Sequence, residues 1–326
     1  MIQSPSATPQ QGPNGADNGA AAPAVSPMTF TGLSAFPLTP LHNDRVDEAA
    51  FTGLIRRLAE AGVDSITVLG STGSYAYLTA DERARVAQLA VQHAQGTPVI
   101  VGIGALRTSQ VLENIDRATA AGANGLLLAP MTYQALTDDD VYELFHTVSE
   151  HTQLPVVVYD NPGTTHFTFN TELYGRIARL PGVASIKIPG VPVDQAEARD
   201  HVNAIRAAVP GHITIGVSGD AFAATGLNAG CDAWYSVIGG TLPAPALAIT
   251  RAAQAGRPAD AEAASARLAP LWQLFAEFGG SLRVVAAIAE QLGLAPHHSL
   301  PLPIQGLTDS DRARVAGVVQ ELGLGQ

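Results

Sequence analysis

The sequence has little cysteine, little lysine and little charge. Its one cysteine, Cys231, excludes an intramolecular disulfide framework and a cysteine-based zinc cluster. A single thiol fits a reducing compartment, and we expect a cytoplasmic protein. Only one of the 18 basic residues is a lysine, Lys187, and the formal net charge is −11. This charge argues against nucleic acid or an anionic membrane surface as a partner, because both require a basic surface.

The sequence also lacks a long apolar run. No stretch reaches the roughly 18 apolar residues that a membrane-spanning helix needs. With 46% hydrophobic and 14% charged residues among 326, the chain is too apolar to be disordered and long enough for one large core or two ordinary ones. We expect a soluble, globular protein without a membrane partner.

Residues 1–28 differ in composition from the rest of the chain. They consist mainly of Ser, Pro, Gln, Gly, Ala and Asn, and Asp17 is their only charged side chain. Such a segment cannot bury enough apolar area to offset its ordering entropy. The basic start and apolar centre of a signal peptide are absent from it. We predict a flexible, low-complexity tail.

From Thr29 onward, short apolar runs alternate with longer amphipathic segments. Most runs are apolar throughout, as expected for parallel strands that helices cover on the outside. Capping sequences at Thr79 and Thr137 mark helix starts, and Gly62 and Gly122 mark helix ends. The expected strands are residues 31–36, 65–70, 98–103, 125–130, 155–160, 183–188, 212–217 and 232–237.

Eight strands that alternate with helical segments predict a (β/α)₈ barrel over residues 29–257. Residues 258–326 are predicted to form a helical C-terminal extension. An open, doubly wound sheet is the alternative architecture. It is disfavoured because residues 36–40, after the first strand, contain no glycine for a dinucleotide-binding turn.

Function in such a barrel gathers at the C-terminal ends of the strands. Lys187 ends the expected sixth strand, between Ile186 and Ile188. Burial lowers the pKa of an amine, and the neutral fraction can attack a carbonyl to form a Schiff base. The alternative is a lysine that extends out of the barrel or pairs with a carboxylate. Because the sequence contains no other lysine, we favour the Schiff-base role.

Two further strand ends carry polar groups. Ser71 and Thr72 lie between two glycines, where hydroxyl and backbone N–H groups could hold a carboxylate, although a simple tight turn is the alternative. Tyr159 ends the strand before that of Lys187 and could transfer protons, although it could also only fill the barrel mouth. The pair His297-His298 lacks a carboxylate at metal-ligand spacing, so we expect no metal site.

The order of these motifs is similar to that of a known family. Gly-Ser-Thr-Gly at 70–73, Tyr-Asp-Asn-Pro at 159–162, Ser-Ile-Lys at 185–187 and Ser-Gly-Asp at 218–220 resemble the dihydrodipicolinate synthase/N-acetylneuraminate lyase family. The resemblance extends from about residue 29 to 322. It implies a (β/α)₈ barrel, usually tetrameric, in which a lysine forms a Schiff base with pyruvate or a related 2-oxo acid. No metal or cofactor takes part in that reaction.

Matching positions imply roles for single residues. Lys187 would be the Schiff-base lysine and Tyr159 the proton-transfer tyrosine, while Ser71 and Thr72 would hold the carboxylate of the 2-oxo acid. Tyr133, after a one-residue shift, would match the tyrosine that reaches a neighbouring subunit in synthases of the family. Thr164 departs from the family pattern, because synthases usually have an arginine there that binds a second carboxylate.

These features predict a metal-independent class I lyase that acts on a 2-oxo acid. It would either cleave a 4-hydroxy-2-oxo acid to pyruvate and an aldehyde or dehydrate a 2-oxo-3-deoxy sugar acid, since one imine serves both reactions. The alternatives are a true 4-hydroxy-tetrahydrodipicolinate synthase, which uses pyruvate and aspartate semialdehyde, and a non-catalytic 2-oxo acid-binding barrel. We expect a homo-oligomer, either a tetramer or a dimer. The residues expected to contact a neutral, hydroxylated second substrate are Thr164, Ser218, Asp220 and Ser236.

Overall fold

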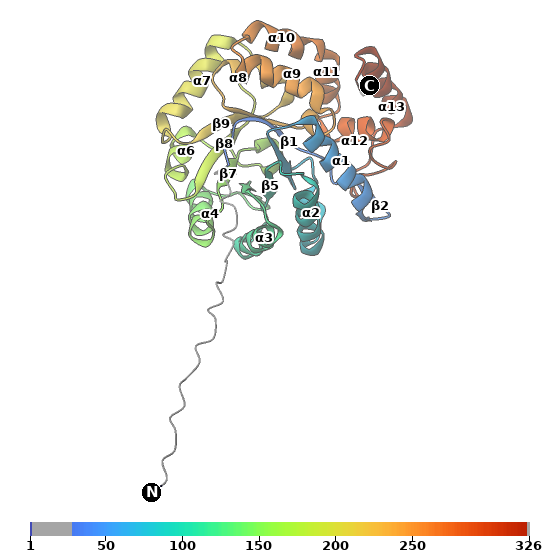
Figure 1. The fold of residues 1–326 in the computed structure, drawn as a ribbon. Coiled ribbons are helices and arrows are strands. Elements are labelled where there is room, and N and C mark those ends of the chain that lie inside the picture. Colours follow the sequence, from blue (N-terminus) through green and yellow to red (C-terminus); the bar gives the residue numbers. More distant parts are fainter. Residues whose placement is uncertain (2–27, 325–326) are drawn as a thin grey trace.

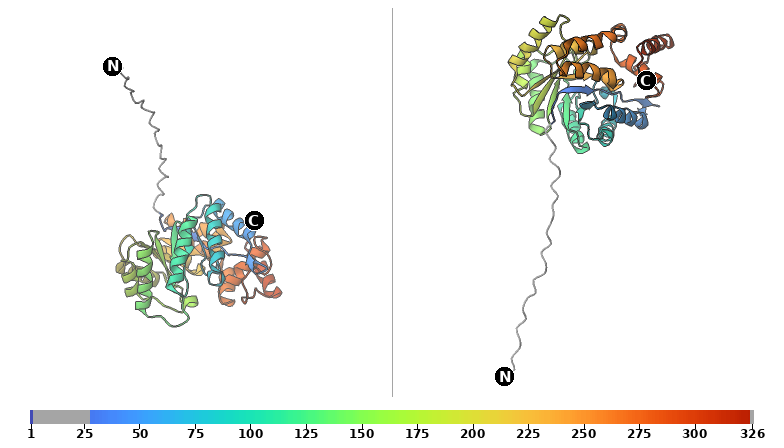
Figure 2. Two further views of the ribbon diagram at one scale, coloured as in Figure 1. Left: turned by 90° about the horizontal axis from the view of Figure 1, so that it is seen from below. Right: turned by 45° about the horizontal axis from the view of Figure 1, so that its top comes forward.

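The computed structural model describes residue 1 and residues 28–324. Most of the expected tail over residues 1–28 lies outside the described residues. Figure 1 shows a ring of helices around a central set of strands, and the two views of Figure 2 show the same arrangement from other sides. Among the described helices, none combines the length and hydropathy that crossing a membrane requires.

The strands form a closed barrel in the order β1-β10-β9-β8-β7-β6-β5-β4, and all of their pairings are parallel. The predicted (β/α)₈ barrel is therefore confirmed, with a strand inside each of the eight expected ranges. The strands are β1 Gly32–Ala35, β4 Ser65–Val68, β5 Val99–Gly102, β6 Gly125–Leu128, β7 Val156–Tyr159, β8 Val183–Ile188, β9 Thr214–Val217 and β10 Ala233–Ser236.

Helices follow the strands on the outside of the barrel. A small hairpin of β2 (Leu41–His42) and β3 (Arg45–Val46) lies between β1 and the first helix, and the four-residue helix α5 (Pro162–Thr165) follows β7. The longer helices are α1 Glu48–Ala61, α2 Ala80–His93, α3 Thr108–Ala121, α4 Asp138–His151, α6 Thr171–Ile177, α7 Gln195–Ala208, α8 Ala223–Asn228 and α9 Pro243–Gln254.

The capping signals in the sequence mark real helix ends. Thr79 and Thr137 each accept a hydrogen bond from a backbone N–H three residues on, and a carboxylate returns the contact, so both form capping boxes. Gly62 and Gly122 end α1 and α3 in the left-handed conformation, which glycine adopts without strain. These four residues thus mark one end each of α1, α2, α3 and α4.

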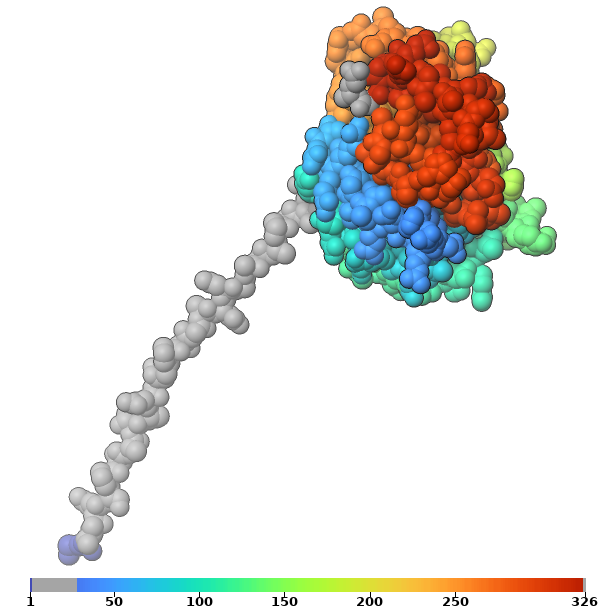
Figure 3. Space-filling model, turned by 90° about the vertical axis from the view of Figure 1, so that its right-hand side faces the viewer, coloured from blue at the N-terminus to red at the C-terminus, as the bar shows by residue number. Residues whose placement is uncertain are grey.

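Four further helices follow α9 in the sequence and form the C-terminal part of the chain. In α12, Val284, Val285 and Ile288 are completely buried, which fixes this helix against the rest of the fold. The backbone N–H of Leu41 donates to the carbonyl of Ser299 at 2.8 Å, so the end of the chain joins the segment that follows β1. Figure 3 shows these two parts of the surface side by side. The four helices are α10 Pro258–Arg267, α11 Ala269–Glu277, α12 Leu282–Gln291 and α13 Asp309–Glu321.

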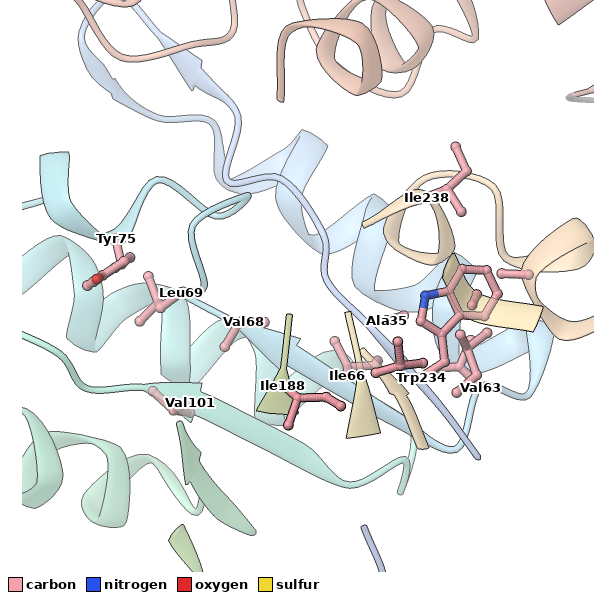
Figure 4. Packing of buried hydrophobic residues seen from close by; sticks show 14 of the residues in the cluster. Ala35, Val63, Ile66, Val68, Leu69, Tyr75, Val101, Ile188, Trp234 and Ile238 are labelled. Carbon is pink, nitrogen blue, oxygen red and sulfur yellow. The ribbon is translucent and has the colours of Figure 1, made fainter. Parts of the chain in front are cut away.

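The strands are buried on both faces. Their outer faces join a large apolar core with the helices, and Figure 4 shows part of it around Trp234. Their inner faces form a second cluster inside the barrel, which includes Phe36, Tyr159 and Tyr235. A Cβ at Gly216 would lie 2.2 Å from the Tyr235 ring, so a glycine is required there for the ring to fill the interior. The candidate site described below lies on this inner face, beside Phe36 and Tyr159.

Candidate active site

Lys187 lies in β8 with its side chain on the inner face of the barrel. Its register partner on β7 is Tyr159. The Nζ atom is 3.6 Å from the centroid of the Tyr159 ring and 5.1 Å from that of Phe36. Only 4% of the residue is exposed, and within residues 28–324 no carboxylate forms an ion pair with it. The structure therefore holds an amine among aromatic rings without a direct counter-charge.

This environment changes the protonation of Lys187. Burial lowers the pKa of the amine to about 7, while the negative charges of Asp220 and Asp160 act in the opposite direction. Removal from water disfavours the charged form of a group, and here that effect is larger than the attraction of the two carboxylates. Near neutral pH a large fraction of Lys187 is consequently neutral, which is the form that attacks a carbonyl carbon.

Tyr159 ends β7 with its hydroxyl in a small hydrogen-bonded group. The hydroxyl accepts a hydrogen bond from Nδ2 of Asn161 at 2.7 Å and lies 3.3 Å from Oγ of Ser71. Burial raises the pKa of the phenol well above its usual value, and the contacts with Ser71 and Asn161 lower it in part. A phenol so placed can deliver a proton to a group bound at Lys187 and take one back.

The segment of residues 70–73 follows β4 and provides Ser71 and Thr72. Thr72 is 5% exposed and Ser71 is half-buried. A Cβ at Gly70 would lie 2.7 Å from the Phe36 ring, so this glycine allows the segment to approach the aromatic ring beside Lys187. The structure places Oγ of Ser71 3.3 Å from the hydroxyl of Tyr159.

Asp220 and Ser236, which we expected to contact substrate, have protein partners instead. The Asp220 carboxylate accepts hydrogen bonds from the Trp234 ring at 3.1 Å, Ser236 at 3.2 Å, and the backbone N–H groups of Val237 at 3.1 Å and Ile238 at 2.7 Å. Burial raises the pKa of Asp220 to about 6 against the effect of these donors. Ser236 is completely buried. This network joins the loops after β9 and β10, and it acts on Lys187 through charge rather than contact.

The other three expected residues lie nearer the surface. Ser218 is half-buried and donates to the carbonyl of Ile188 at 2.8 Å. Thr164 is exposed on α5, with its hydroxyl 3.4 Å from the carbonyl of Asn161. Tyr133 lies in the loop between β6 and α4 and is 88% exposed. Within one chain, Tyr133 does not belong to the buried group around Lys187.

Several residues of the site received no role from the sequence. Asp160 is 3% exposed and accepts a hydrogen bond from the Tyr174 hydroxyl at 2.5 Å. Burial raises the pKa of Asp160 to about 6. Asp160 and Asn161 follow Tyr159 directly, and Phe36 follows β1, so strand-end position was an available signal for all three. Tyr174 carries no such signal, because its contact depends on how α6 packs.

The arrangement suits carbonyl chemistry at an amine. It combines a partly neutral lysine, a buried phenol and a segment of hydroxyl and N–H groups at the ends of β8, β7 and β4. In the part of the chain that the structure describes, no three His, Cys, Asp or Glu side chains gather as they would to hold a metal ion.

Comparison with known proteins identifies relatives along nearly the whole chain. The model of the dihydrodipicolinate synthetase family matches residues 29–322. The fold is similar to that of dihydrodipicolinate synthase from Agrobacterium tumefaciens str. C58, with a TM-score of 0.86, 44% identity, and coverage of 90% of this chain and 98% of that one.

Curated proteins give matches of two lengths. The 4-hydroxy-tetrahydrodipicolinate synthase of Halorhodospira halophila (strain DSM 244 / SL1) is 32% identical over 304 residues, which is 91% of this chain and 98% of that protein. The synthase of the same name from Phenylobacterium zucineum (strain HLK1) is 33% identical over 164 residues, so the chain spans about half of that relative, 55% of its length.

The resemblance inferred from the motif order is confirmed by these matches. The family match begins and ends with the barrel and its C-terminal helices. It includes the segment of residues 70–73, Tyr159 and Lys187. This chain therefore belongs to the dihydrodipicolinate synthetase family, whose members are lyases that form a Schiff base with pyruvate, and it is an enzyme of the class I lyase type.

Proposed function

We propose that this enzyme forms an imine between Lys187 and pyruvate or a related 2-oxo acid, and that it needs neither a metal nor a cofactor. The observation that carries the proposal is the buried amine of Lys187, 3.6 Å from the Tyr159 ring centroid and without an ion-pair partner among the described residues. A lysine held only to stabilise the fold would be expected to pair with a carboxylate.

The reaction begins with the neutral amine of Lys187. It attacks the C2 carbonyl, a C–N bond forms and the C=O π bond breaks, and one proton then moves from the nitrogen to the oxygen to give a neutral carbinolamine. Tyr159 then protonates the hydroxyl group, which leaves as water, and the resulting iminium withdraws electrons from C3. The substrate carboxylate binds at Ser71 and Thr72, where hydroxyl and backbone N–H groups can donate to it.

The second half of the substrate is a neutral, hydroxylated group. Thr164, exposed on α5 after β7, offers one hydroxyl and no charge. We infer cleavage of a 4-hydroxy-2-oxo acid or dehydration of a 2-oxo-3-deoxy sugar acid, both of which use the same iminium. A second candidate is the synthase reaction with aspartate semialdehyde, which the names of the relatives from Halorhodospira halophila and Phenylobacterium zucineum favour.

Reduction with borohydride tests the proposal. Pyruvate and borohydride together should add the mass of one pyruvate, less one oxygen atom, to the chain, and fragmentation should place it on Lys187. Because Lys187 is the only lysine, the N-terminal amine is the one other aliphatic amine to be distinguished. Borohydride without pyruvate and the variant Lys187→Met are the controls. An unmodified chain would exclude imine chemistry, as expected for a barrel that only binds 2-oxo acids.

A substrate panel then separates the reactions. Short 4-hydroxy-2-oxo acids, 2-oxo-3-deoxy sugar acids, and pyruvate with aspartate semialdehyde should be compared by kcat/KM. Release of pyruvate from the first group identifies an aldolase, and loss of water from the second identifies a dehydratase. The highest kcat/KM for aspartate semialdehyde would establish the synthase.

We infer that the enzyme assembles as a homo-oligomer, either a tetramer or a dimer. Tyr133 is 88% exposed and Leu106 is 59% exposed, and side chains of this size are often covered at subunit contacts. Sedimentation velocity should give a species larger than one chain. A monomer with undiminished activity would contradict this inference.

A further inference from the structure

Asn161 occupies a position where its side chain would usually cap a helix. It is the N-cap residue of α5, and asparagine at such a position normally accepts a hydrogen bond from a backbone N–H in the first turn. In this structure its side chain makes no cap contact. The amide instead donates from Nδ2 to the Tyr159 hydroxyl at 2.7 Å and to Oγ of Ser71 at 3.1 Å.

The backbone around Asn161 fixes this orientation. Its carbonyl accepts hydrogen bonds from the N–H groups of Thr164 and Thr165, each at 3.0 Å, and from the Thr165 hydroxyl at 3.0 Å. These contacts hold the residue through its main chain, so its side-chain amide can donate to Tyr159 and Ser71. An amide nitrogen only donates hydrogen bonds, so the oxygens of Tyr159 and Ser71 both act as acceptors toward it.

We propose that Asn161 is a positioning residue that stabilises the ionised oxygen of Tyr159 while this tyrosine transfers protons. The proposal rests on the imine function above and adds a residue to it. The two hydrogen atoms on Nδ2 occupy one acceptor site on each hydroxyl oxygen. In the proposed arrangement Ser71 donates its own hydrogen to Tyr159, so the Tyr159 hydrogen is available to a group bound at Lys187.

The proton balance shows where Asn161 acts. When the carbinolamine loses water, the Tyr159 O–H bond breaks and its proton leaves with the hydroxyl group, so that a phenolate and an iminium remain. The phenolate then takes a proton from C3, the C3–H electron pair forms the C2–C3 double bond, and the iminium becomes a neutral enamine. The phenolate exists only between these steps, and at 6% exposure of Tyr159 water contributes little to its stability.

Exchange of the methyl hydrogens of pyruvate for deuterium measures this step without a second substrate. NMR in D₂O gives the exchange rate, and borohydride trapping gives the equilibrium fraction of imine. We expect Asn161→Ala to slow exchange by about 10- to 100-fold, the effect of losing one hydrogen bond to a charged oxygen. The trapped fraction should fall as well, because the trapped iminium coexists with the phenolate. The aspartate in Asn161→Asp has nearly the same shape, but its carboxylate cannot donate a hydrogen bond. The exchange rate should therefore fall at least as far as in Asn161→Ala.

Gly163→Ala is the matched control on the same helix, because a Cβ at Gly163 would have no neighbour within 4 Å. It should leave both exchange and trapping unchanged. Undiminished exchange in Asn161→Asp would show that the side chain accepts rather than donates, and would overturn the proposal. Exchange that falls in Asn161→Ala and is restored in part by Asn161→Asp would also overturn it, because the shape of the side chain rather than its donor would then be what matters. Absence of trapping in the unmodified enzyme would instead reject the imine function itself.

Discussion

Tyr159 and Lys187 are direct register partners on the neighbouring strands β7 and β8, and the Nζ atom of the lysine lies 3.6 Å from the centroid of the tyrosine ring. Side chains of paired residues point to the same face of a sheet, so the strand register itself brings the amine and the phenol together. The inner face of the barrel then removes both from water.

Replacement of Lys187 should abolish the chemistry and preserve the fold. Methionine fills a similar volume without a charge, so Lys187→Met should remove borohydride trapping and lower kcat by at least about 10⁴-fold, because an oriented nucleophile has a very high effective concentration. Its thermal stability should equal or exceed that of the unmodified protein, because burying an amine without an ion-pair partner lowers the free energy of unfolding. Lys187→Arg should not restore trapping, because the guanidinium stays protonated. Turnover in either variant would refute the mechanism.

The rate of imine formation should depend on pH in the range set by Lys187. Burial lowers the pKa of its amine from 10.5 to about 7. Below pH 7 the amine is mostly protonated and unreactive, so the rate should rise about tenfold per pH unit, and above pH 7 it should reach a plateau. The measurement is the initial rate of labelling of the Lys187 peptide by pyruvate and cyanoborohydride. A rate that keeps rising to pH 10 would show an exposed, unperturbed lysine.

The strand pairing behind this site could be predicted only in part. Eight apolar runs were sufficient to predict the barrel and to place Lys187 and Tyr159 at adjacent strand ends. The register contains an irregularity, however, since Val156 pairs with Val183 and Val157 pairs with Ser185, which skips Ala184. Without it, Tyr159 would oppose Ile186. Nothing in the apolar pattern indicates such a bulge, because inner and outer faces are equally hydrophobic.

The same two-sided burial makes the partners of some polar groups hard to predict from the sequence. Ser236 ends β10, which suggested contact with substrate, but Tyr235 takes the inner face and successive side chains alternate. Ser236 therefore bonds to Asp220. Asn161 was visible in its motif, yet sequence rules assign asparagine before a helix to capping. Its contact with Tyr159 depends on the backbone path into α5.

The Asp220 network should contribute strongly to stability. Asp220→Ala would leave three buried donors and one half-buried donor without an acceptor, and we expect it to lower the free energy of unfolding by at least about 3 kcal/mol. Ser236→Ala, which breaks the contact with Asp220 and leaves the N–H of Gly239 unpaired, should cost about 1–2 kcal/mol. Urea unfolding with unchanged m-values measures both. If Asp220→Ala lowers the free energy of unfolding less than Ser236→Ala does, the structural role of Asp220 is contradicted.

Removal of divalent ions should not affect the enzyme. The imine supplies the electron withdrawal that a metal ion provides in other aldolases, so no metal is required by the proposed steps. Incubation with EDTA followed by gel filtration should leave kcat and KM for the best substrate of the panel unchanged. Activity that is lost in EDTA and recovered with a divalent ion would require a different mechanism.

Specificity should follow from the absence of charge at residue 164. Thr164 is exposed on α5, directly after the segment that contains Tyr159, and its hydroxyl lies near the carbonyl of Asn161. A second substrate that carries a carboxylate would find one neutral hydroxyl there. A bidentate arginine–carboxylate contact is roughly twice as strong as a neutral hydrogen bond. The unmodified enzyme should therefore bind an anionic partner weakly.

We expect kcat/KM for aspartate semialdehyde to be lower than that for neutral hydroxy-aldehydes by about 10-fold or more, the effect of one missing charge-assisted contact. Thr164→Arg should narrow this difference by improving the anionic substrate, and Thr164→Val, which removes the hydroxyl, should weaken only the neutral partners. Pyruvate trapping at Lys187 should be the same in all three proteins, because the proposed binding site of the first substrate is at Ser71 and Thr72 rather than at residue 164. If the unmodified enzyme prefers aspartate semialdehyde, the synthase assignment replaces the lyase assignment proposed above, and the second carboxylate must then bind at a residue other than Thr164.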